Sequence, residues 1–411
     1  VMADAFFDEG FCRALIEAMG SGLTLPTAGG KLLFTHTDAF AKLAGSDVAT
    51  LPVTAPTAQS SNTVVTLGER LFLKGYRRLR PGINPELEMG RFLTEVAKYP
   101  NCVPVAGALE YVAADGSTMT LAMVQAYVPN QGDGWDYTLS YLERHLEAMR
   151  TVDAPQPADV HGGFLSLMHT LGERTAELHL ALSQRTGNAA FDPEPLTAQD
   201  VIAWRERAAS EAGRTLDRLA ERLADLPHEL QDEAKRLLVR AAEVRARVAD
   251  FPLDGQSGVK TRFHGDYHLG QVLVSRNDFL IIDFEGEPAR SFEERRQRSS
   301  ALRDVAGMVR SFNYARWSAL RRVAQSADEL VKLEPAAREW EAETRDAFLG
   351  AYMARMSHGG AAQSAESATR LLALFEFEKA MYELRYELDN RLDWVQVPLQ
   401  GILALIDRHG H

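Results

Sequence analysis

The sequence is short of cysteine and has no excess of positive charge, and both shortages exclude classes of protein. Only Cys12 and Cys102 are present among 411 residues, so neither a disulfide framework nor a multi-cysteine zinc site is expected. Acidic residues outnumber basic ones by 57 to 45, which gives a formal net charge of −12. This charge argues against a general nucleic-acid-binding protein, because neutralising phosphates requires a surplus of Lys and Arg.

Long apolar runs are absent as well. No stretch approaches the roughly 20 apolar residues needed to span a bilayer. Asp4, Asp8 and Glu9 interrupt the apolar residues near the start, which is not the pattern of a signal peptide. Hydrophobic residues make up 45% and charged residues 25% of the chain, values typical of a folded globular protein. We therefore expect a soluble, cytoplasmic protein that binds neither membranes nor nucleic acids.

The chain changes character after Val128. Before this point, short segments with β-strand character alternate with turns and a helix at 86–97, which predicts a small lobe built on a mixed sheet. After it, most segments have helical periodicity, interrupted by a strand pair at 271–274 and 279–282. We predict an α+β fold with two lobes, a small sheet-bearing N-lobe and a larger, mainly helical C-lobe, with a cleft between them. The predicted boundaries are 59–128 and 129–411.

Two aspartates flank the predicted strand pair. Asp266 lies in His264-Gly265-Asp266-Tyr267-His268-Leu269-Gly270-Gln271, and Asp283 follows the apolar run Leu280-Ile281-Ile282. Either aspartate alone is more simply explained as the cap of a turn or of a strand end. As a pair, with the amide of Gln271 between them, they favour phosphoryl transfer. One carboxylate orients the attacking hydroxyl, and the other holds the magnesium that bridges the phosphates.

These residues resemble the motifs of the aminoglycoside-phosphotransferase-like branch of the protein-kinase superfamily. The fuller pattern, H-G-D-Y-H-L-G-Q-V-L followed by I-D-F-E-G-E-P-A-R, resembles bacterial maltokinases, which use ATP to phosphorylate maltose at its anomeric hydroxyl. The resemblance implies a bilobal protein-kinase-like fold that uses ATP and Mg²⁺. It implies Asp266 as the catalytic base and Gln271 and Asp283 as metal ligands. His264 is interpreted as a brace of the catalytic loop, and His268 as a contact to the sugar or the phosphate.

The nucleotide site is predicted around Lys74, at the end of the apolar segment Leu71-Phe72-Leu73. A lysine placed in this way holds the α- and β-phosphates if a helix carboxylate fixes its ammonium. Of Glu86 and Glu88 on the next predicted helix, we predict Glu88 as that partner.

No G-x-G-x-x-G loop precedes this strand. A polar stretch stands there instead, and maltokinases carry a similar Ser-Asn stretch, although an ordinary polar turn also explains it. We predict that this stretch covers the phosphates and that the hinge between the lobes binds the adenine through its backbone. The predicted nucleotide-binding residues are Ser60, Ser61 and Asn62 in the loop, and Gln125, Tyr127 and Val128 in the hinge.

The sugar acceptor site is predicted on the helical segment 378–391. At 3.6 residues per turn, Glu383, Glu387 and Asn390 share one face, and Tyr382 and Tyr386 share a neighbouring one. Spacing alone favours a solvated helix with an inward-packing tyrosine stripe. The block Y-E-L-R-Y-E-L-D-N-R, with D-W-V and Trp394 just beyond, resembles the maltokinase segment that contacts the disaccharide and implies a substrate-binding role.

Two further features near the motifs are assigned structural roles. Asp304 lies at a predicted helix start, where its carboxylate can accept hydrogen bonds from the catalytic-loop backbone. Arg295, Arg296 and Arg298 form a basic cluster that is more simply solvated, with phosphate steering left open.

The leading hypothesis is an ATP-dependent maltokinase of trehalose-to-glycogen metabolism, with maltose or a similar small sugar as partner. The alternatives are a kinase of the same fold that acts on glucosamine or an aminoglycoside, and a nucleotide-binding module without catalysis. The last is disfavoured because every expected catalytic group is present. Maltokinases start with an N-terminal cap subdomain, so residues 1–58 are interpreted as a partial cap. The chain is expected to be a fragment, and a trehalose synthase domain in the same chain or complex is the partner that fits this interpretation.

Overall fold

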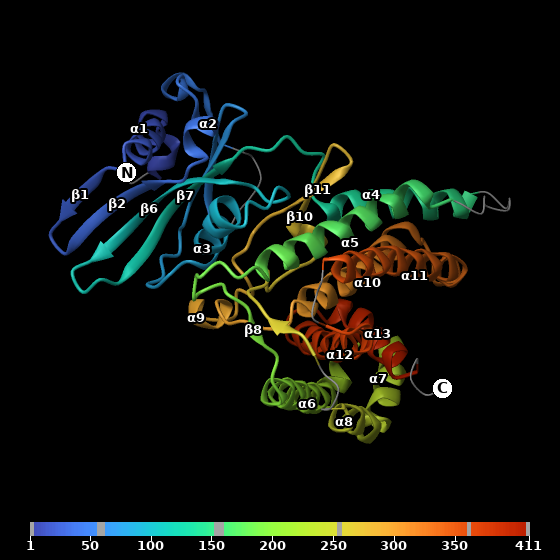
Figure 1. The fold of residues 1–411 in the computed structure, drawn as a ribbon. Coiled ribbons are helices and arrows are strands. Elements are labelled where there is room, and N and C mark those ends of the chain that lie inside the picture. The colour runs from blue at the N-terminus through green and yellow to red at the C-terminus, as the bar shows by residue number, and fades with distance from the viewer. Residues whose placement is uncertain (1–3, 56–61, 152–159, 253–256, 360–362, 408–411) are drawn as a thin grey trace.

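The computed structural model describes residues 4–55, 62–151, 160–252, 257–359 and 363–407. Figure 1 shows a sheet with short helices at one end of the molecule and most of the helices at the other. Each part has its own buried apolar core. This arrangement is the two-lobed α+β architecture predicted from the sequence.

The small lobe is built on one sheet. Within the described residues this sheet has seven strands in the order β1-β2-β6-β7-β5-β4-β3, and neighbouring strands are antiparallel. Three of them come from the segment predicted as a partial cap, so in the structure this segment belongs to the sheet-bearing lobe. The strands are β1 (Thr24–Thr27), β2 (Gly30–His36), β3 (Val53–Thr54), β4 (Thr63–Leu67), β5 (Leu71–Gly75), β6 (Val105–Ala113) and β7 (Thr118–Ala126).

Short helices cover this sheet. Helix α1 begins after Asp8, whose carboxylate accepts a hydrogen bond from the backbone of Phe11, and it buries Cys12 and Ile16. Helix α3 begins after Asn84, which caps it, and continues as a π-helical turn. These elements are η1 (Ala5–Phe7), α1 (Glu9–Gly20), α2 (Phe40–Ala44), η2 (Val48–Thr50), α3 (Pro85–Arg91) and η3 (Phe92–Val96).

The large lobe is mainly helical. Figure 1 shows its helices gathered at one end of the molecule. The rings of Trp317 and Trp340 are fully buried in the core of this lobe. The elements are α4 (Gly134–Thr151), α5 (Gly162–Leu182), β8 (Glu194–Pro195), α6 (Ala198–Arg222), η4 (Leu223–Asp225), α7 (His228–Val239), α8 (Ala241–Ala249), β9 (Val259–Lys260), η5 (Leu269–Gln271), β10 (Val272–Ser275), β11 (Asp278–Ile281), α9 (Phe292–Arg295), α10 (Leu302–Val323), α11 (Ala327–His358), α12 (Ala365–Asn390), η6 (Leu392–Trp394) and α13 (Gln396–Asp407). Among the described helices, none combines the length and the apolar content that crossing a bilayer requires.

The predicted strand pair forms a hairpin, β10 and β11. Arg276 and Asn277 at its turn have φ of 53° and 59°, as a tight two-residue hairpin turn requires. The strands are antiparallel, and the backbone N–H of Ile282 donates to the carbonyl of Gln271 at 3.0 Å. The hairpin therefore brings Gln271 and Asp283, which are 12 positions apart in the chain, to the same end.

Candidate active site

The loop that carries Asp266 is hydrogen-bonded through its backbone to the side chain of Asp304. The two oxygens of this carboxylate, which is 2% exposed, accept hydrogen bonds from the backbone N–H groups of His264 (2.7 Å) and Gly265 (2.9 Å). His179 contacts the same carboxylate through Nε2 at 3.2 Å. His264 in turn contacts the carbonyl of Ile282 through Nε2 at 2.8 Å. The hydrogen bonds expected of Asp304 are confirmed, and His264 links the catalytic loop to the segment that precedes Asp283.

Gln271 and Asp283 form an oxygen-rich pair. The side-chain amide of Gln271 donates to Oδ2 of Asp283 at 3.2 Å, which leaves its own carbonyl oxygen available. Asp283 has a φ of 61°, a conformation that costs energy for a residue other than glycine. Its Oδ1 is buried and has no hydrogen-bond partner among the described residues. A carboxylate oxygen without a donor, beside an amide oxygen, fits a hard divalent cation such as Mg²⁺.

Lys74 on β5 is held by Glu86, so the prediction of Glu88 was wrong. The Lys74 ammonium lies 2.7 Å from Oε2 of Glu86, and the two side chains are 11% and 4% exposed. Tyr76 donates its hydroxyl to the same carboxylate at 2.6 Å. Successive residues on a helix are about 100° apart, so Glu86 and Glu88 point in different directions from α3.

The Lys74–Glu86 pair is charged in spite of its burial. Burial lowers the pKa of Lys74, but Glu86 and Glu285 outweigh this effect and hold that pKa above its usual value. Burial raises the pKa of Glu86, and the Lys74 charge opposes that rise. Because only 2.7 Å separates the ammonium from the carboxylate, we take both groups as ionised.

Glu88 contacts the large lobe instead. Its two oxygens accept hydrogen bonds from Arg296 at 2.7 and 2.8 Å, and Oε2 also accepts from Arg262 at 2.8 Å. Burial raises the pKa of Glu88, but Arg296 and Arg262 outweigh this and lower it overall. Arg262 is 1% exposed and lies over the ring of Phe191. Helix α3 is therefore tied to β5 by one glutamate and to the large lobe by the other.

Glu285 is a functional candidate that the sequence did not assign. Its Oε1 lies 2.7 Å from the Lys74 ammonium, which also contacts Glu86. Oxygens of Glu86, Asp283 and Glu285 lie within 4.8 Å of one another, close enough to share a metal ion. The sequence feature that could have identified Glu285 is its position two residues after Asp283, where protein kinases carry glycine.

The predicted adenine hinge lies where the chain leaves β7 for α4. The backbone N–H of Tyr127 donates to the carbonyl of Arg70 at 2.7 Å, and the carbonyl of Val128 accepts from the Asn130 side chain. Gln125 is half-buried in β7. Contacts of these residues with a nucleotide remain a prediction. Of the predicted phosphate-covering residues, Asn62 is buried at the start of β4, whereas Ser60 and Ser61 lie outside the described residues.

A cavity of about 550 Å³ opens beside Asp266 in the large lobe. Asn390 does not line it, contrary to the prediction, because its side-chain amide donates to the carbonyl of Tyr386. Among the lining residues that sequence reasoning missed, Asp133, Trp135 and Tyr314 lie on elements far from α12 in the chain, whereas Lys379 and Arg391 lie on α12 or directly after it. The predicted residues that line it are His268, Tyr382, Glu383, Tyr386, Glu387 and Trp394.

The two glutamates of this cavity are engaged in ion pairs. Glu383 accepts from Nε of the buried Arg310 at 2.8 Å. Glu387, which is 1% exposed, lies 2.6 Å from Nη2 of Arg391 and also accepts from the hydroxyl of Tyr314. These carboxylates fix the shape of the cavity wall as well as lining it.

Aromatic rings and a neutral histidine complete the cavity. The rings of Tyr314 and Trp394 are nearly parallel, with centroids 6.3 Å apart, and Tyr382 and Tyr386 are 6.4 Å apart. Burial lowers the pKa of His268, whose Nδ1 accepts a hydrogen bond from the backbone of Gly270. The cavity thus offers flat apolar faces and hydrogen-bonding groups beside Asp266, as sugar binding requires.

The fold belongs to the two-lobed, kinase-like class. It matches a solved structure described as glucosamine kinase in complex with glucosamine, ADP and inorganic phosphate, with a TM-score of 0.68, 24% identity, and coverage of 97% of this chain and 83% of that one. A second structure, glucosamine kinase in crystal form A, gives a TM-score of 0.69, 24% identity, and coverage of 98% and 82%. At this identity the likeness establishes the fold.

Two characterised enzymes are similar in sequence, and both are glucosamine kinases. The enzyme of Streptacidiphilus jiangxiensis is 29% identical over 307 residues, which are 74% of this chain but only 62% of that enzyme. The enzyme of Mycolicibacterium smegmatis is 27% identical over 353 residues, 85% of this chain and 79% of that enzyme. No family model matches the chain.

Proposed function

We propose that this protein is an ATP-dependent sugar kinase with glucosamine, or a similar amino sugar, as its acceptor. One observation carries the proposal: Asp266 lines an aromatic, polar cavity, and the loop that holds it is linked through His264 to the segment leading into Asp283. The Lys74 ammonium, from the small lobe, lies 3.9 Å from Oδ1 of Asp283 in the large lobe. The similar glucosamine kinases support both the reaction class and the acceptor.

The residues divide the work of phosphoryl transfer. Asp266 orients the sugar hydroxyl and accepts its proton as the hydroxyl oxygen bonds to the γ-phosphorus and the bond to ADP breaks. Lys74, fixed by Glu86, binds the phosphates of ATP. Gln271 and Asp283 would hold Mg²⁺, which neutralises charge on the phosphates when bound. Asp304 keeps Asp266 in place through the loop backbone.

Asp133 favours an amino sugar over a neutral one. This residue lines the acceptor cavity, and no Lys or Arg within the described chain forms an ion pair with it. Its Oδ1 accepts the backbone N–H of Asp136 at 2.8 Å, and burial raises the pKa of the carboxyl. An uncompensated, half-buried carboxylate is stabilised by a cationic ligand, and the ammonium of glucosamine is such a group.

Maltose is the second candidate, supported by the resemblance of the 382–394 block to maltokinases. A panel of glucosamine, glucose, maltose and an aminoglycoside, with ATP and Mg²⁺ and scored by ADP release, tests both. We expect glucosamine to give the highest kcat/KM, with glucose about tenfold lower because it lacks the ammonium. Turnover of maltose but not of glucosamine would refute glucosamine as the acceptor and identify maltose instead. Absence of ADP release with every sugar would refute the kinase assignment.

Asp133→Asn is the matched variant for this panel. It keeps the size of the side chain and its cap of α4 and removes only the charge. We expect the preference for glucosamine over glucose to fall about tenfold while kcat for glucose is unchanged. An undiminished preference would exclude Asp133 as the group that recognises the amine.

A further inference from the structure

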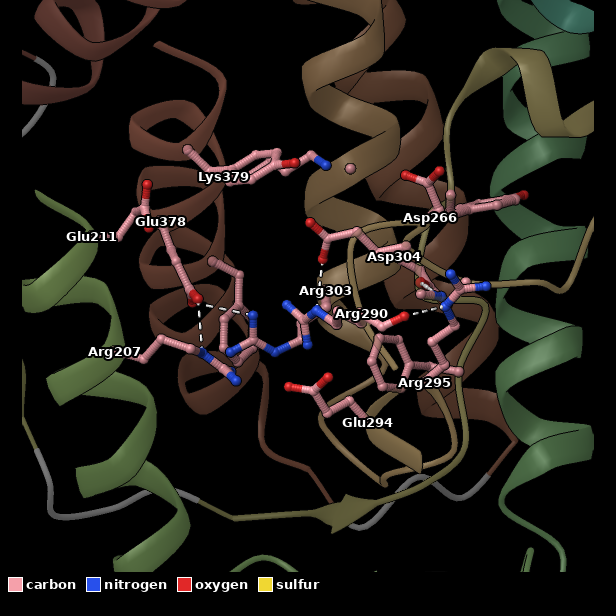
Figure 2. Close-up of a pocket in the computed structure, with 18 of the residues that line it drawn as sticks. Arg207, Glu211, Asp266, Arg290, Glu294, Arg295, Arg303, Asp304, Glu378 and Lys379 are labelled. Carbon is pink, nitrogen blue, oxygen red and sulfur yellow. Dashed lines mark hydrogen bonds and ion pairs between the residues drawn. The ribbon is translucent and has the colours of Figure 1, made fainter. Parts of the chain in front are cut away.

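A second cavity, of about 250 Å³, meets the acceptor cavity at Asp266, Lys379 and Tyr382. It lies among α6, α9, α10 and α12. Figure 2 shows Arg207 and Glu378 on one side of it and Asp266 and Arg295 on the other. Apart from Asp266, Asp304 and Tyr382, and Arg295, for which phosphate steering was left open, the sequence analysis gave its lining no role, and the proposed transfer reaction uses only its edge at Asp266.

Two carboxylates of this cavity are each shared by two guanidinium groups. Glu378 lies 2.9 Å from Nε of Arg207 and 3.1 Å from Nη1 of Arg303. Glu211 lies 2.5 Å from Arg214 and 2.7 Å from Arg385. We call these four basic residues the arginine wall; two carboxylates leave it with two uncompensated positive charges.

The rest of the lining, with three basic and four acidic side chains, reduces this excess from two charges to one. In total, seven basic and six acidic side chains line the cavity. Among the acids, Asp304 accepts two backbone N–H groups, and Glu294 caps the start of α9. The Lys379 ammonium has no ion pair within the described chain and lies 5.3 Å from the centre of the Tyr382 ring. Positive charge therefore exceeds negative charge in a space next to the reacting groups.

Arg303 supplies an independent sign of a missing partner. Its Nη2 is buried and has no hydrogen-bond acceptor among the described residues, whereas Nη1 and Nε bond to Glu378 and Ser299. Burial lowers the pKa of Arg303 to about 10; Glu378 opposes this shift, and Arg207 adds to it. Buried guanidinium donors are normally satisfied, so Arg303, which lines the cavity, keeps one donor that an acceptor close by could satisfy.

We propose that this cavity is an oxyanion subsite that binds a phosphate group, either free or as the phosphate ester of a sugar. Planar guanidinium groups match the oxygens of phosphate, and the cavity exceeds the roughly 30 Å³ share of one water several-fold. The part of this proposal that names a sugar phosphate as ligand rests on the proposed function, because a sugar kinase would form that phosphate ester at Asp266. The subsite would then hold product or an anionic acceptor beside the catalytic carboxylate.

Calorimetric titration of the full chain with inorganic phosphate, without nucleotide and at constant ionic strength, tests the subsite. We expect saturable binding that Arg207→Gln and Arg303→Gln each weaken about tenfold, since each removes a charge-assisted contact. Arg207 is 40% exposed, so its replacement should fold even if the Arg303 variant does not. Lys74→Gln, which removes the predicted ATP-phosphate lysine, should leave phosphate binding unchanged.

The outcomes separate the possibilities. Loss of binding in Lys74→Gln with retention in both arginine variants would place the anion in the nucleotide site and overturn the proposal, as would the absence of saturable binding to the wild-type chain. Tighter binding of glucosamine 6-phosphate than of free phosphate would identify the ester as ligand, and the reverse order would identify free phosphate. A chain that binds phosphate at the arginine wall but releases no ADP in the sugar panel would refute the kinase proposal and leave the subsite standing.

Discussion

The two lobes contribute to the site in different ways. In the small lobe the functional charges are closely paired and buried, with Lys74 and Glu86 exposed by 11% and 4%. In the large lobe, Asp283 is 40% exposed, and Asp266 lines two cavities. Under the proposed function, the small lobe would supply a fixed charge for the nucleotide, whereas the large lobe would present more exposed carboxylates to metal and acceptor. Substitutions in the large lobe should therefore affect catalysis, and those in the paired glutamates should affect binding or stability.

Asp266→Asn should have the largest effect. The amide keeps the shape of the side chain but cannot accept the proton of the acceptor hydroxyl, so kcat should fall about 10³-fold. Binding of ATP, measured by calorimetry, should remain within about twofold of wild type, because Lys74 and Asp283 are untouched. A kcat within tenfold of the wild-type value would exclude Asp266 as the group that accepts the proton.

Asp283→Ala comes next. Its Oδ1 has no donor within the described chain, so we expect its role to be metal binding, and kcat should fall about 100-fold or more. The diagnostic measurement is a magnesium titration of ADP release. Activity of the variant should no longer rise with magnesium at the concentration that saturates the wild type, and an unchanged magnesium curve would contradict a metal role.

Glu88→Gln should act on stability. Removing this charge leaves Arg262, which is 1% exposed, without its carboxylate, and breaking a buried ion pair of this kind costs about 3 kcal/mol. Urea unfolding measures that loss.

Glu86→Gln is the matched comparison on the same helix. It should raise the KM for ATP about tenfold, because the Lys74 ammonium is less firmly held. If both variants changed KM for ATP equally, the division of labour between the two glutamates would be wrong.

Glu387→Gln should have the smallest effect. The variant keeps a hydrogen bond to Tyr314 but loses the ion pair to Arg391, so the wall of the acceptor cavity should loosen. We expect KM for the sugar to rise about fivefold, with KM for ATP unchanged. Steady-state kinetics with each substrate varied in turn gives both values, and an equal rise in both would place the acceptor elsewhere.

Local sequence was sufficient for the catalytic hairpin. Asp266, Gln271 and Asp283 lie within a short segment whose turn residues specify an antiparallel pair, so their approach follows from the connectivity. The same holds for Asp304, whose position at a helix start exposes its carboxylate to the backbone N–H groups of the loop. The hairpin contacts depend on residues close in the chain, whereas those of Asp304 span 40 positions and were predicted from its place at a helix end.

Contacts between distant elements were not predictable in this way. Arg296 and Arg298 were interpreted as solvated, yet Arg296 binds Glu88 of the small lobe and Arg298 binds Glu194. Which of Glu86 and Glu88 contacts Lys74 depends on how α3 is rotated about its axis relative to β5. That rotation is set by the packing of the helix and cannot be inferred from the positions of the two glutamates in the sequence. The prediction that Asn390 lines the acceptor cavity was wrong for the same reason. The spacing of residues on one helical face does not reveal which element packs against that face.

By itself, the sequence determined the two-lobed α+β architecture, the catalytic hairpin and the acid pair, since periodicity and turn chemistry act over a few residues. Only the tertiary structure decided which glutamate holds Lys74, how Glu285 joins it, and how the arginine wall assembles from α6, α10 and α12. Those contacts join residues up to 211 positions apart. Their formation depends on how whole helices pack, and packing is set by the complete core rather than by any local segment.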